Sequence, residues 1–295
     1  MNKPIIVITG PTASGKTSLA IDLANKFDGE IINADSRSIY REMDIATSKP
    51  TRKELDNIAH HLVDIVDPNE SFSLSDYKKL AEKEIKSVQD RGKIPLLVGG
   101  TGLYIDAVVY DFNLTEIAPD QKYREELEKL STTEIGIKLK EVDPETYKII
   151  DRLNRRRLIR ALEVATQSQK SLTKLQTKKP LPRNVLYFVL DCPREVLYKK
   201  IDNRVDAWFS KGLVEETKNL SAKYSFDLPS MSSIGYHEIA QYLDGRISLS
   251  EASEIMKKRT RNYAKRQITW FKRNQDAVWI GSEKEALSLI TSFLK

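Results

Sequence analysis

A glycine-rich segment lies between a predicted strand and a predicted helix near the N-terminus, and it restricts the possible folds strongly. Residues 10–17 read Gly-Pro-Thr-Ala-Ser-Gly-Lys-Thr, the complete phosphate-loop pattern G-x-x-x-x-G-K-T. An apolar run over residues 5–8 precedes it, and a helical pattern over residues 18–26 follows it. The glycines let backbone N–H groups turn inward, and the helix N-terminus adds a positive dipole end. The loop therefore predicts a site for linked phosphates, whatever these are attached to.

The residues of this loop are all candidates for phosphate binding. Lys16 is placed to reach the terminal phosphates, and the Thr17 hydroxyl is placed to bind Mg²⁺. The rest of the loop is expected to line the same site: Gly10, Pro11, Thr12, Ala13, Ser14 and Gly15.

Composition is that of a soluble globular protein, and 295 residues can bury a large core in one or two domains. Cys192 is the single cysteine, which excludes an internal disulfide framework and a cysteine-based zinc site. The histidines at 60, 61 and 237 show no metal-ligand spacing. No signal-peptide pattern is present, and no apolar run approaches the ~20 residues of a membrane span. We therefore expect a cytoplasmic protein that does not enter a membrane.

Strands and helices alternate in the first part of the chain. Strands are predicted over residues 4–9, 30–34 and 95–98, and helices over residues 15–26 and 75–91. This alternation implies a parallel, doubly wound sheet, in which ligands bind beyond the carboxyl ends of the strands.

Polar features follow directly after these strands: the phosphate loop, Asp35 and Thr101. Asp35 has two interpretations. It caps the turn before Ser36, or it is a carboxylate that accepts a proton from a nucleophile or holds a metal through water. The strand at 95–98 ends in Gly-Gly-Thr, without the acid that often helps hold Mg²⁺ in kinases and ATPases of this fold.

The pattern changes near residue 114. Residues 114–181 are charged and helical in periodicity, without a convincing strand, and residues 185–190 and 277–280 then read as further strands. We predict an α/β fold with a P-loop NTPase-like parallel sheet core. Residues 1–113 and 182–295 form this core with its C-terminal helices, and residues 114–181 form a helical insertion domain.

Positive charge is concentrated in two segments of a chain whose formal net charge is +6. Residues 152–160 contain five arginines and no acid, and residues 255–275 contain eight lysines or arginines and no acid. A face of like charge repels itself unless a polyanion covers it, so both segments favour a nucleic-acid partner.

In a helix at about 100° per residue, the second segment forms three columns. One holds lysines 258, 265 and 272, the next arginines 259, 266 and 273, and the third Met256, Tyr263 and Trp270. The aromatic column is more typical of a core face than of a base-stacking platform. The alternative to RNA binding is a solvated helix with this side in the core.

Five motifs together resemble the tRNA dimethylallyltransferase family. They are the loop at 10–17, Asn-Ala-Asp-Ser-Arg at 33–37, Val-Gly-Gly-Thr-Gly-Leu-Tyr at 98–104, Arg-Leu-Ile-Arg-Ala-Leu-Glu at 157–163, and Lys-Arg-Gln-Ile-Thr-Trp at 265–270. The matches run in order over nearly the full chain.

The resemblance implies transfer of the dimethylallyl group from dimethylallyl diphosphate to N6 of the adenosine 3′-adjacent to the tRNA anticodon, with release of diphosphate. It implies Mg²⁺ as cofactor and three catalytic residues. Asp35 is the base, Thr101 hydrogen-bonds in the reacting centre, and Arg204 contacts the diphosphate. We expect the enzyme to act as a monomer.

The resemblance also assigns residues to the anticodon stem-loop, partly through the insertion domain. Lysines and arginines are expected to hold phosphates, and Gln267 is the candidate for a base edge. The target adenosine must leave the stack to reach Asp35. The assigned residues are Ser36, Arg37, Ser38, Arg156, Arg157, Arg160, Lys265, Arg266, Gln267, Trp270 and Lys272.

Two other functions use parts of the same pattern. A small-molecule or nucleotide kinase using ATP fits the loop and Asp35 but leaves both basic segments unexplained. A nucleic-acid-dependent NTPase explains the basic segments but requires an acid after the strand at 95–98.

Overall fold

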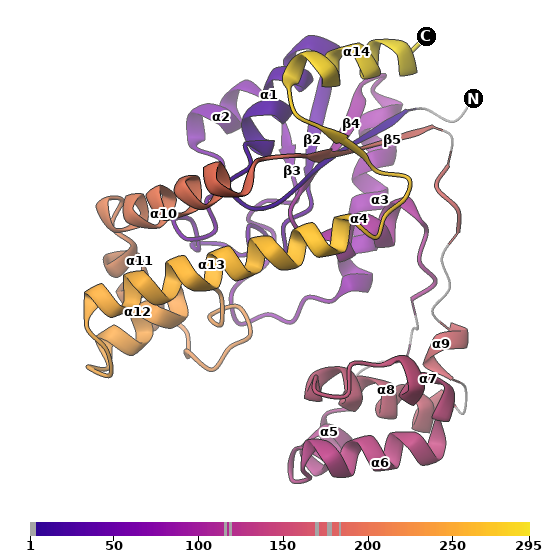
Figure 1. Cartoon of the computed structure of the whole chain (residues 1–295), viewed down its shortest axis with the longest axis vertical. Helices are drawn as coiled ribbons and strands as arrows, with labels where there is room; N and C mark the ends of the chain where they lie inside the picture. Colours follow the sequence, from indigo (N-terminus) through magenta and orange to yellow (C-terminus); the bar gives the residue numbers. More distant parts are fainter. Residues whose placement is uncertain (1–3, 115–116, 118–119, 169–170, 176–178, 183) are drawn as a thin grey trace. The chain divides into compact units, whose positions relative to one another are not determined.

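The computed structural model describes residues 4–114, 117, 120–168, 171–175, 179–182 and 184–295. The chain divides into two compact units (Figure 1). Met1–Val109 and Leu181–Lys295 form one unit, which we call the core unit, and Tyr110–Pro180 forms the insertion unit.

The core unit contains a sheet of six strands in the order β3-β2-β4-β1-β5-β6, and every pair is parallel. Central strand β1 places Ile6 opposite Leu96 of β4 and Leu186 of β5. The predicted α/β fold with a parallel sheet is confirmed. Edge strand β3 was not predicted, because two residues leave no readable periodicity. The bounds are β1 Ile5–Thr9, β2 Gly29–Asn33, β3 His60–His61, β4 Ile94–Gly99, β5 Val185–Leu190 and β6 Val278–Ile280.

Helices cover both faces of this sheet, which explains why its strands read as continuous apolar runs. On one face Ile6 and Phe188 pack in one cluster with Leu23 of α1 and Ile290 of α14. On the other face Tyr187 donates a hydrogen bond to Asp106 of α4. The bounds are α1 Lys16–Phe27, α3 Leu74–Asp90, α4 Gly102–Val109 and α14 Glu283–Phe293.

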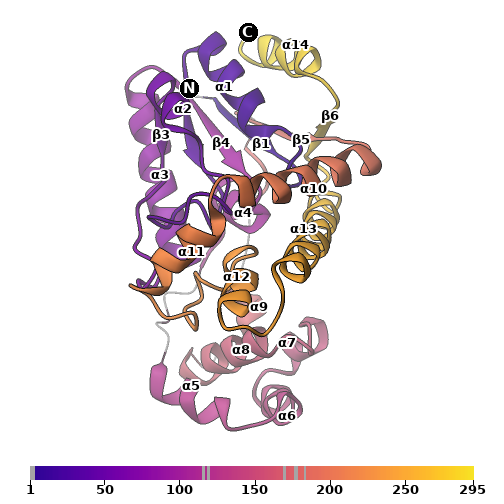
Figure 2. The ribbon, with the colours of Figure 1, turned by 90° about the vertical axis from the view of Figure 1, so that its left-hand side faces the viewer.

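Among the described residues, the core unit contains five further helices. Helices α10 and α13 run side by side (Figures 1 and 2), and Arg261 of α13 pairs with Asp202 of α10 at 2.8 Å. Because α13 ends at Phe271, Arg273 lies outside the helical column in which the sequence placed it. The bounds are α2 Arg52–Asn57, α10 Arg194–Ser210, α11 Leu213–Ser221, α12 Tyr236–Leu243 and α13 Leu249–Phe271.

Helices are the only regular secondary structure among the described residues of the insertion unit. Its core is a cluster of buried leucine and isoleucine side chains from α5, α6 and α8. Helix α7 begins at Pro144, and the Asp143 side chain caps it by accepting a hydrogen bond from Thr146 N at 3.1 Å. The bounds are α5 Gln121–Glu128, α6 Thr132–Val142, α7 Pro144–Ile149, α8 Arg155–Ser168 and α9 Leu172–Leu175.

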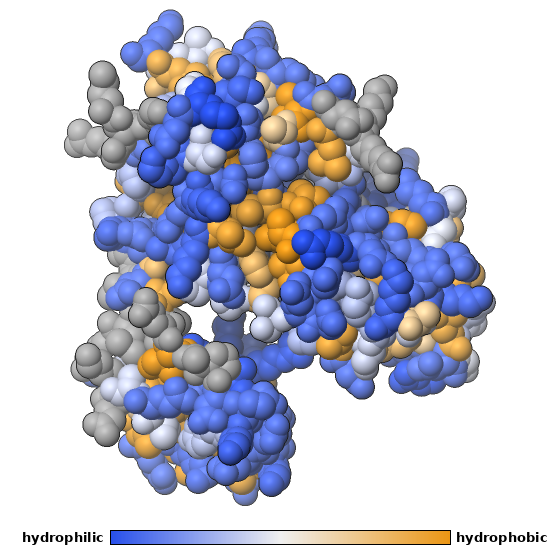
Figure 3. Space-filling view, turned by 180° about the vertical axis from the view of Figure 1, so that it is seen from behind, coloured by the Kyte–Doolittle hydropathy of each residue, from blue (hydrophilic) through white to orange (hydrophobic). Residues whose placement is uncertain are grey.

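The face drawn in Figure 3 is mostly hydrophilic, with its hydrophobic side chains gathered in patches. Within the described part of the chain, none of the helices combines the length and the apolar character needed to cross a membrane.

Candidate active site

The phosphate loop joins β1 to α1 at the carboxyl edge of the sheet. Gly15 adopts a left-handed conformation, with φ 101°, directly before the first residue of α1, a position that favours glycine. Lys16 lies at the start of the helix, and its Nζ donates a hydrogen bond to Pro11 O at 2.8 Å. The Thr17 side chain is exposed. The loop thus holds its own lysine over the space in which phosphates would bind.

Asp35 follows β2 at the same edge, and its two carboxylate oxygens have different surroundings. Oδ1 accepts a hydrogen bond from Arg37 N at 2.9 Å, which is the turn-capping role considered for this residue. Oδ2 makes no hydrogen bond to any residue that the structure describes. The two interpretations of Asp35 are therefore compatible, because capping uses only one of its oxygens.

Thr101 follows β4 and lies beside the turn that carries Asp35. Its Oγ1 accepts a hydrogen bond from Ser36 N at 3.0 Å and lies 3.2 Å from Ser36 Oγ. Thr101 also hydrogen-bonds with the side chain of Tyr263, on α13. Thr101 therefore ties the turn at Asp35 to the C-terminal helix.

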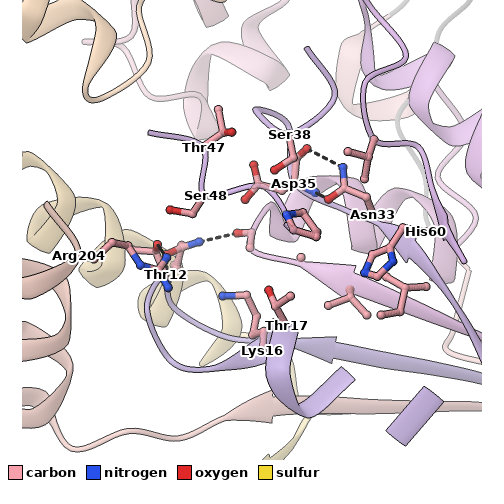
Figure 4. A pocket seen from close by; sticks show the side chains of 17 residues that line it. Thr12, Lys16, Thr17, Asn33, Asp35, Ser38, Thr47, Ser48, His60 and Arg204 are labelled. Atoms are coloured by element: carbon pink, nitrogen blue, oxygen red, sulfur yellow. Dashed lines mark hydrogen bonds between the residues drawn. The ribbon is translucent and has the colours of Figure 1, made fainter. Parts of the chain in front are cut away.

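Two cavities meet at Asp35. The first, of about 110 Å³, is lined by Lys16 and Thr17, and Figure 4 shows both side chains pointing into it. The second, of about 280 Å³, is lined by Arg37 and Arg266. The residues that line both cavities are Thr12, Asp35, Thr47, Ser48 and Arg204.

The electrostatics of the first cavity favour an anion. Burial, and then the nearby Arg204 guanidinium, lower the pKa of Lys16 to about 7, while Asp35 acts in the opposite direction. Burial also lowers the pKa of Arg204, again against the effect of Asp35. Arg204 reaches from α10 to the phosphate loop and donates to Thr12 Oγ1 at 3.3 Å. An anion bound between the two cations would relieve their repulsion and favour the charged lysine.

The basic face of α13 is smaller than its sequence suggests. Lys257, Arg259 and Arg261 pair with Asp206, Glu238 and Asp202 respectively, acids supplied by α10 and α12. Acids from other helices therefore balance three of the eight cations within residues 255–275. The three cations predicted to bind RNA, at 265, 266 and 272, are exposed and form no ion pair with any described residue.

Gln267 was expected to read a base edge, and the structure gives its amide other partners. The residue is 5% exposed; its Oε1 accepts from Thr12 N and its Nε2 donates to Gly100 O, both at 2.8 Å. Both ends of this buried amide are thus bonded to backbone groups of the protein. Trp270 is also engaged, because its Nε1 donates to Asp106 Oδ2 at 2.8 Å.

Arg160 was expected to contact RNA, but it forms part of the insertion unit's own structure. It pairs with Glu163, which is fully buried and also pairs with Arg124 at 2.8 Å. By contrast, Arg156 and Arg157 on the same helix are exposed. Of the three arginines of α8 predicted to bind RNA, Arg156 and Arg157 are thus the more exposed.

The residues after Asp35 differ in accessibility. Ser38 is 6% exposed and lines the first cavity, whereas Ser36 and Arg37 line the second. The Arg37 guanidinium also donates to Pro229 O at 3.0 Å.

Sequence reasoning did not select three residues that line the site: Thr47, Ser48 and His60. His60 Nδ1 bonds Ile58 O at 2.7 Å, and burial lowers the pKa of the ring. Thr47 and Ser48 carry no sequence signal beyond their place in the loop that follows Asp35. By contrast, His61 pairs with Glu30.

A parallel sheet with a complete phosphate loop, and a cavity lined by two cations and a carboxylate, define a P-loop enzyme for a phosphorylated substrate. The chain belongs to the IPP transferase family, whose sequence profile matches residues 38–274. It is therefore a prenyltransferase, and the family resemblance is confirmed.

Three solved structures are similar to this chain. The full-length tRNA isopentenylpyrophosphate transferase from Bacillus halodurans is 40% identical, with a TM-score of 0.76 over 99% of this chain and 97% of that chain. The tRNA delta(2)-isopentenylpyrophosphate transferase from Staphylococcus epidermidis is 37% identical, with a TM-score of 0.71 over 99% of both chains. A eukaryotic dimethylallyltransferase acting on tRNA is 28% identical, with a TM-score of 0.86 over 99% of this chain and 80% of that chain.

Proposed function

We propose that this chain transfers the dimethylallyl group of dimethylallyl diphosphate to N6 of the adenosine 3′-adjacent to the anticodon of tRNA. The observation that carries the proposal is the position of Asp35 at the junction of two cavities. Lys16 and Thr17 of the phosphate loop line one cavity, and Arg37 and Arg266, cations suited to RNA, line the other. A base between a diphosphate donor and a nucleophile on RNA is what a direct transfer requires.

The first cavity suits the donor at both of its ends. Lys16 and Arg204 would hold the diphosphate and stabilise the negative charge that grows on it as the allylic C–O bond breaks. The cavity wall also includes Ile31, Val63 and Val98, apolar side chains that would accommodate the dimethylallyl group.

The acceptor would enter from the second cavity. The exocyclic amine attacks C1 of the dimethylallyl group, the C–O bond to diphosphate breaks, and the proton released from N6 passes to Asp35. Oδ2 is the suitable oxygen, because Oδ1 is occupied by Arg37 N. Thr101 holds the turn that aims this carboxylate.

The residues that line the first cavity are suited to a Mg²⁺ ion that is held mainly by the phosphates of the substrate. The exposed Thr17 hydroxyl is a hard oxygen donor at the phosphate site, and Asp35 lines the same cavity. No group of three or more His, Cys, Asp or Glu among the described residues could hold a metal by itself. Mg²⁺ usually takes few protein ligands together with substrate phosphates and water, and it would supply charge neutralisation there.

RNA contacts in this proposal come from exposed cations of both units. Lys265, Arg266 and Lys272 of the core unit and Arg156 and Arg157 of the insertion unit would each hold phosphates of the anticodon stem-loop. The catalytic groups all belong to one chain, so a monomer is sufficient. The proposed reaction takes place in the cytoplasm, where tRNA is the substrate.

The test supplies unmodified tRNA, labelled dimethylallyl diphosphate and Mg²⁺. Label should enter RNA, and nuclease digestion with mass spectrometry should locate it on the adenosine next to the anticodon. The matched control is the same tRNA with guanosine at that position, which should remain unlabelled. Robust ATP turnover without label in RNA would replace this proposal with the kinase alternative.

A further inference from the structure

The Gln267 side chain joins two loops of the active site to the C-terminal helix. Its Oε1 accepts from the backbone of Thr12 in the phosphate loop, and its Nε2 donates to the backbone of Gly100 after β4, both at 2.8 Å. These backbone groups lie at the ends of neighbouring strands, β1 and β4. One amide therefore sets the spacing between the phosphate loop and the segment that carries Thr101.

Gly100 provides the space for this bridge. A β-carbon at this position would lie 2.4 Å from Gln267 Nε2, closer than nonbonded atoms can approach. No positive φ marks Gly100, so a side chain there would be excluded by the amide rather than by the backbone. The glycine and the glutamine form a matched pair.

The same helix also carries exposed cations, one of which, Arg266, lines the second cavity beside Tyr263. Tyr263, Gln267 and Trp270 of α13 approach the segment at 100–102. Lys265 and Arg266, between the first two of these residues in sequence, are exposed and unpaired among the described residues. A shift of α13 caused by RNA on its exposed side would move the Gln267 amide directly.

Thr12 is well placed to respond to that movement. Its backbone N–H is held by Gln267 and its hydroxyl by Arg204, and the next residue, Ala13, has a left-handed φ of 64°. A non-glycine residue in this conformation is strained and needs support from its surroundings. The amide supplies such support at the neighbouring peptide.

We propose that Gln267 is a positioning residue that couples RNA binding on α13 to diphosphate binding in the phosphate loop. This inference rests on the proposed function. RNA held by Lys265 and Arg266 fixes α13, and Gln267 then holds Thr12 in the conformation that accepts phosphate. Because coupling is reciprocal, each ligand strengthens binding of the other by the same factor.

The test uses inorganic diphosphate with Mg²⁺ and an unmodified anticodon stem-loop RNA. Calorimetry gives the dissociation constant of diphosphate with and without saturating RNA. The wild-type chain should bind diphosphate about tenfold more tightly with RNA present, within the usual range of coupling. In Gln267→Met, which keeps side-chain length but loses both hydrogen bonds, this ratio should fall to about one. Its RNA affinity measured without diphosphate, and the salt dependence of that affinity, should stay unchanged.

Two further variants separate coupling from general damage. Gly100→Ala displaces the amide while Gln267 is retained. As a single change it should lower the ratio of diphosphate dissociation constants, and combined with Gln267→Met it should cause no further decrease. Gln241→Met is a matched change on α12, where the amide bonds only His237 among the described residues, and it should leave the ratio at its wild-type value.

The outcomes distinguish this inference from the proposed function. Equal ratios in the wild type and Gln267→Met, with both ligands bound by each, overturn the coupling alone and leave the transferase intact. Failure of the wild-type chain to bind RNA overturns both.

Discussion

The Nζ of Lys16 donates a hydrogen bond to the carbonyl oxygen of Pro11 at 2.8 Å, so the phosphate loop binds its own lysine. Burial and the nearby Arg204 lower the pKa of this ammonium to about 7. In the ligand-free enzyme Lys16 is therefore charged below pH 7 and mostly neutral above pH 8.

This pKa predicts that diphosphate binds less tightly as pH rises above 7. A bound anion favours charged Lys16, so binding above the free-state pKa must take up a proton, at a cost of up to about tenfold in affinity per pH unit. Below pH 7 the contribution of charged Lys16 to diphosphate affinity is constant. Calorimetry of diphosphate from pH 6 to 9 measures it. Lys16→Met corrects for titration of the ligand itself, and equal pH profiles in both proteins would contradict the prediction.

Replacement of Asp35 by asparagine should separate catalysis from binding. The amide oxygen can still accept from Arg37 N, so the turn is retained, but the side chain can no longer take a proton at neutral pH. We expect kcat to fall about 10²–10⁴-fold, with RNA and diphosphate affinities nearly unchanged. Single-turnover kinetics and binding assays measure the two effects. A comparable loss of binding would make Asp35 a structural cap.

Lys265→Ala with Arg266→Ala should weaken RNA binding and reduce its salt dependence. Each lost phosphate contact lowers the slope of log K against log salt by about 0.7–0.9, so the slope should drop by about 1.5 for the pair. Lys257→Ala is the control, because Lys257 is already paired with Asp206 within the protein. Equal slopes in the wild type and the double variant would return this face to the solvated-helix interpretation.

Within α8, Arg157 and Arg160 should behave differently when replaced by alanine. Arg160→Ala removes one partner of buried Glu163 and should destabilise the chain by about 1–3 kcal/mol. Arg157→Ala should leave stability unchanged and weaken tRNA binding. Denaturant unfolding and RNA titration measure the two effects. Unchanged stability in Arg160→Ala would show that Arg124 alone satisfies Glu163.

Thr17→Ala should raise the Mg²⁺ concentration needed for diphosphate binding, because Thr17 is the expected protein ligand. Calorimetric titrations of diphosphate at several Mg²⁺ concentrations measure this requirement without relying on turnover. Thr47→Ala, in the wall of the same cavity, is the comparison. An unaltered requirement would place the metal on other groups.

Much of the core and part of the site could be read from local patterns. The apolar run before the phosphate loop and the run at 185–190 became β1 and β5 within one residue of the predicted bounds. The proximity of Asp35 and Thr101 could be predicted, because the carboxyl ends of parallel strands lie at one edge of the sheet. Strand β3 and the position of His60 in the cavity wall could not be predicted, since neither has a local signal in the sequence.

Partners of charged and polar side chains could not be read in this way. The residues at 257–261 look unbalanced in sequence, yet Asp202, Asp206 and Glu238 arrive from other helices to pair with them. Arg160 and Gln267 were both predicted to contact RNA, and each makes contacts inside its own unit that the sequence did not indicate.

By itself, the sequence determined that this chain has a parallel sheet, a phosphate loop and the motifs of one enzyme family. Those features depend on periodicity and spacing, which are local. Only the tertiary structure decided which cations remain unpaired. It also decided that Gln267 bridges Thr12 and Gly100, although Gln267 and Gly100 are 167 residues apart in the chain. Ion pairing and hydrogen bonding depend on distances of a few ångströms between groups far apart in the chain, and folding alone sets those distances.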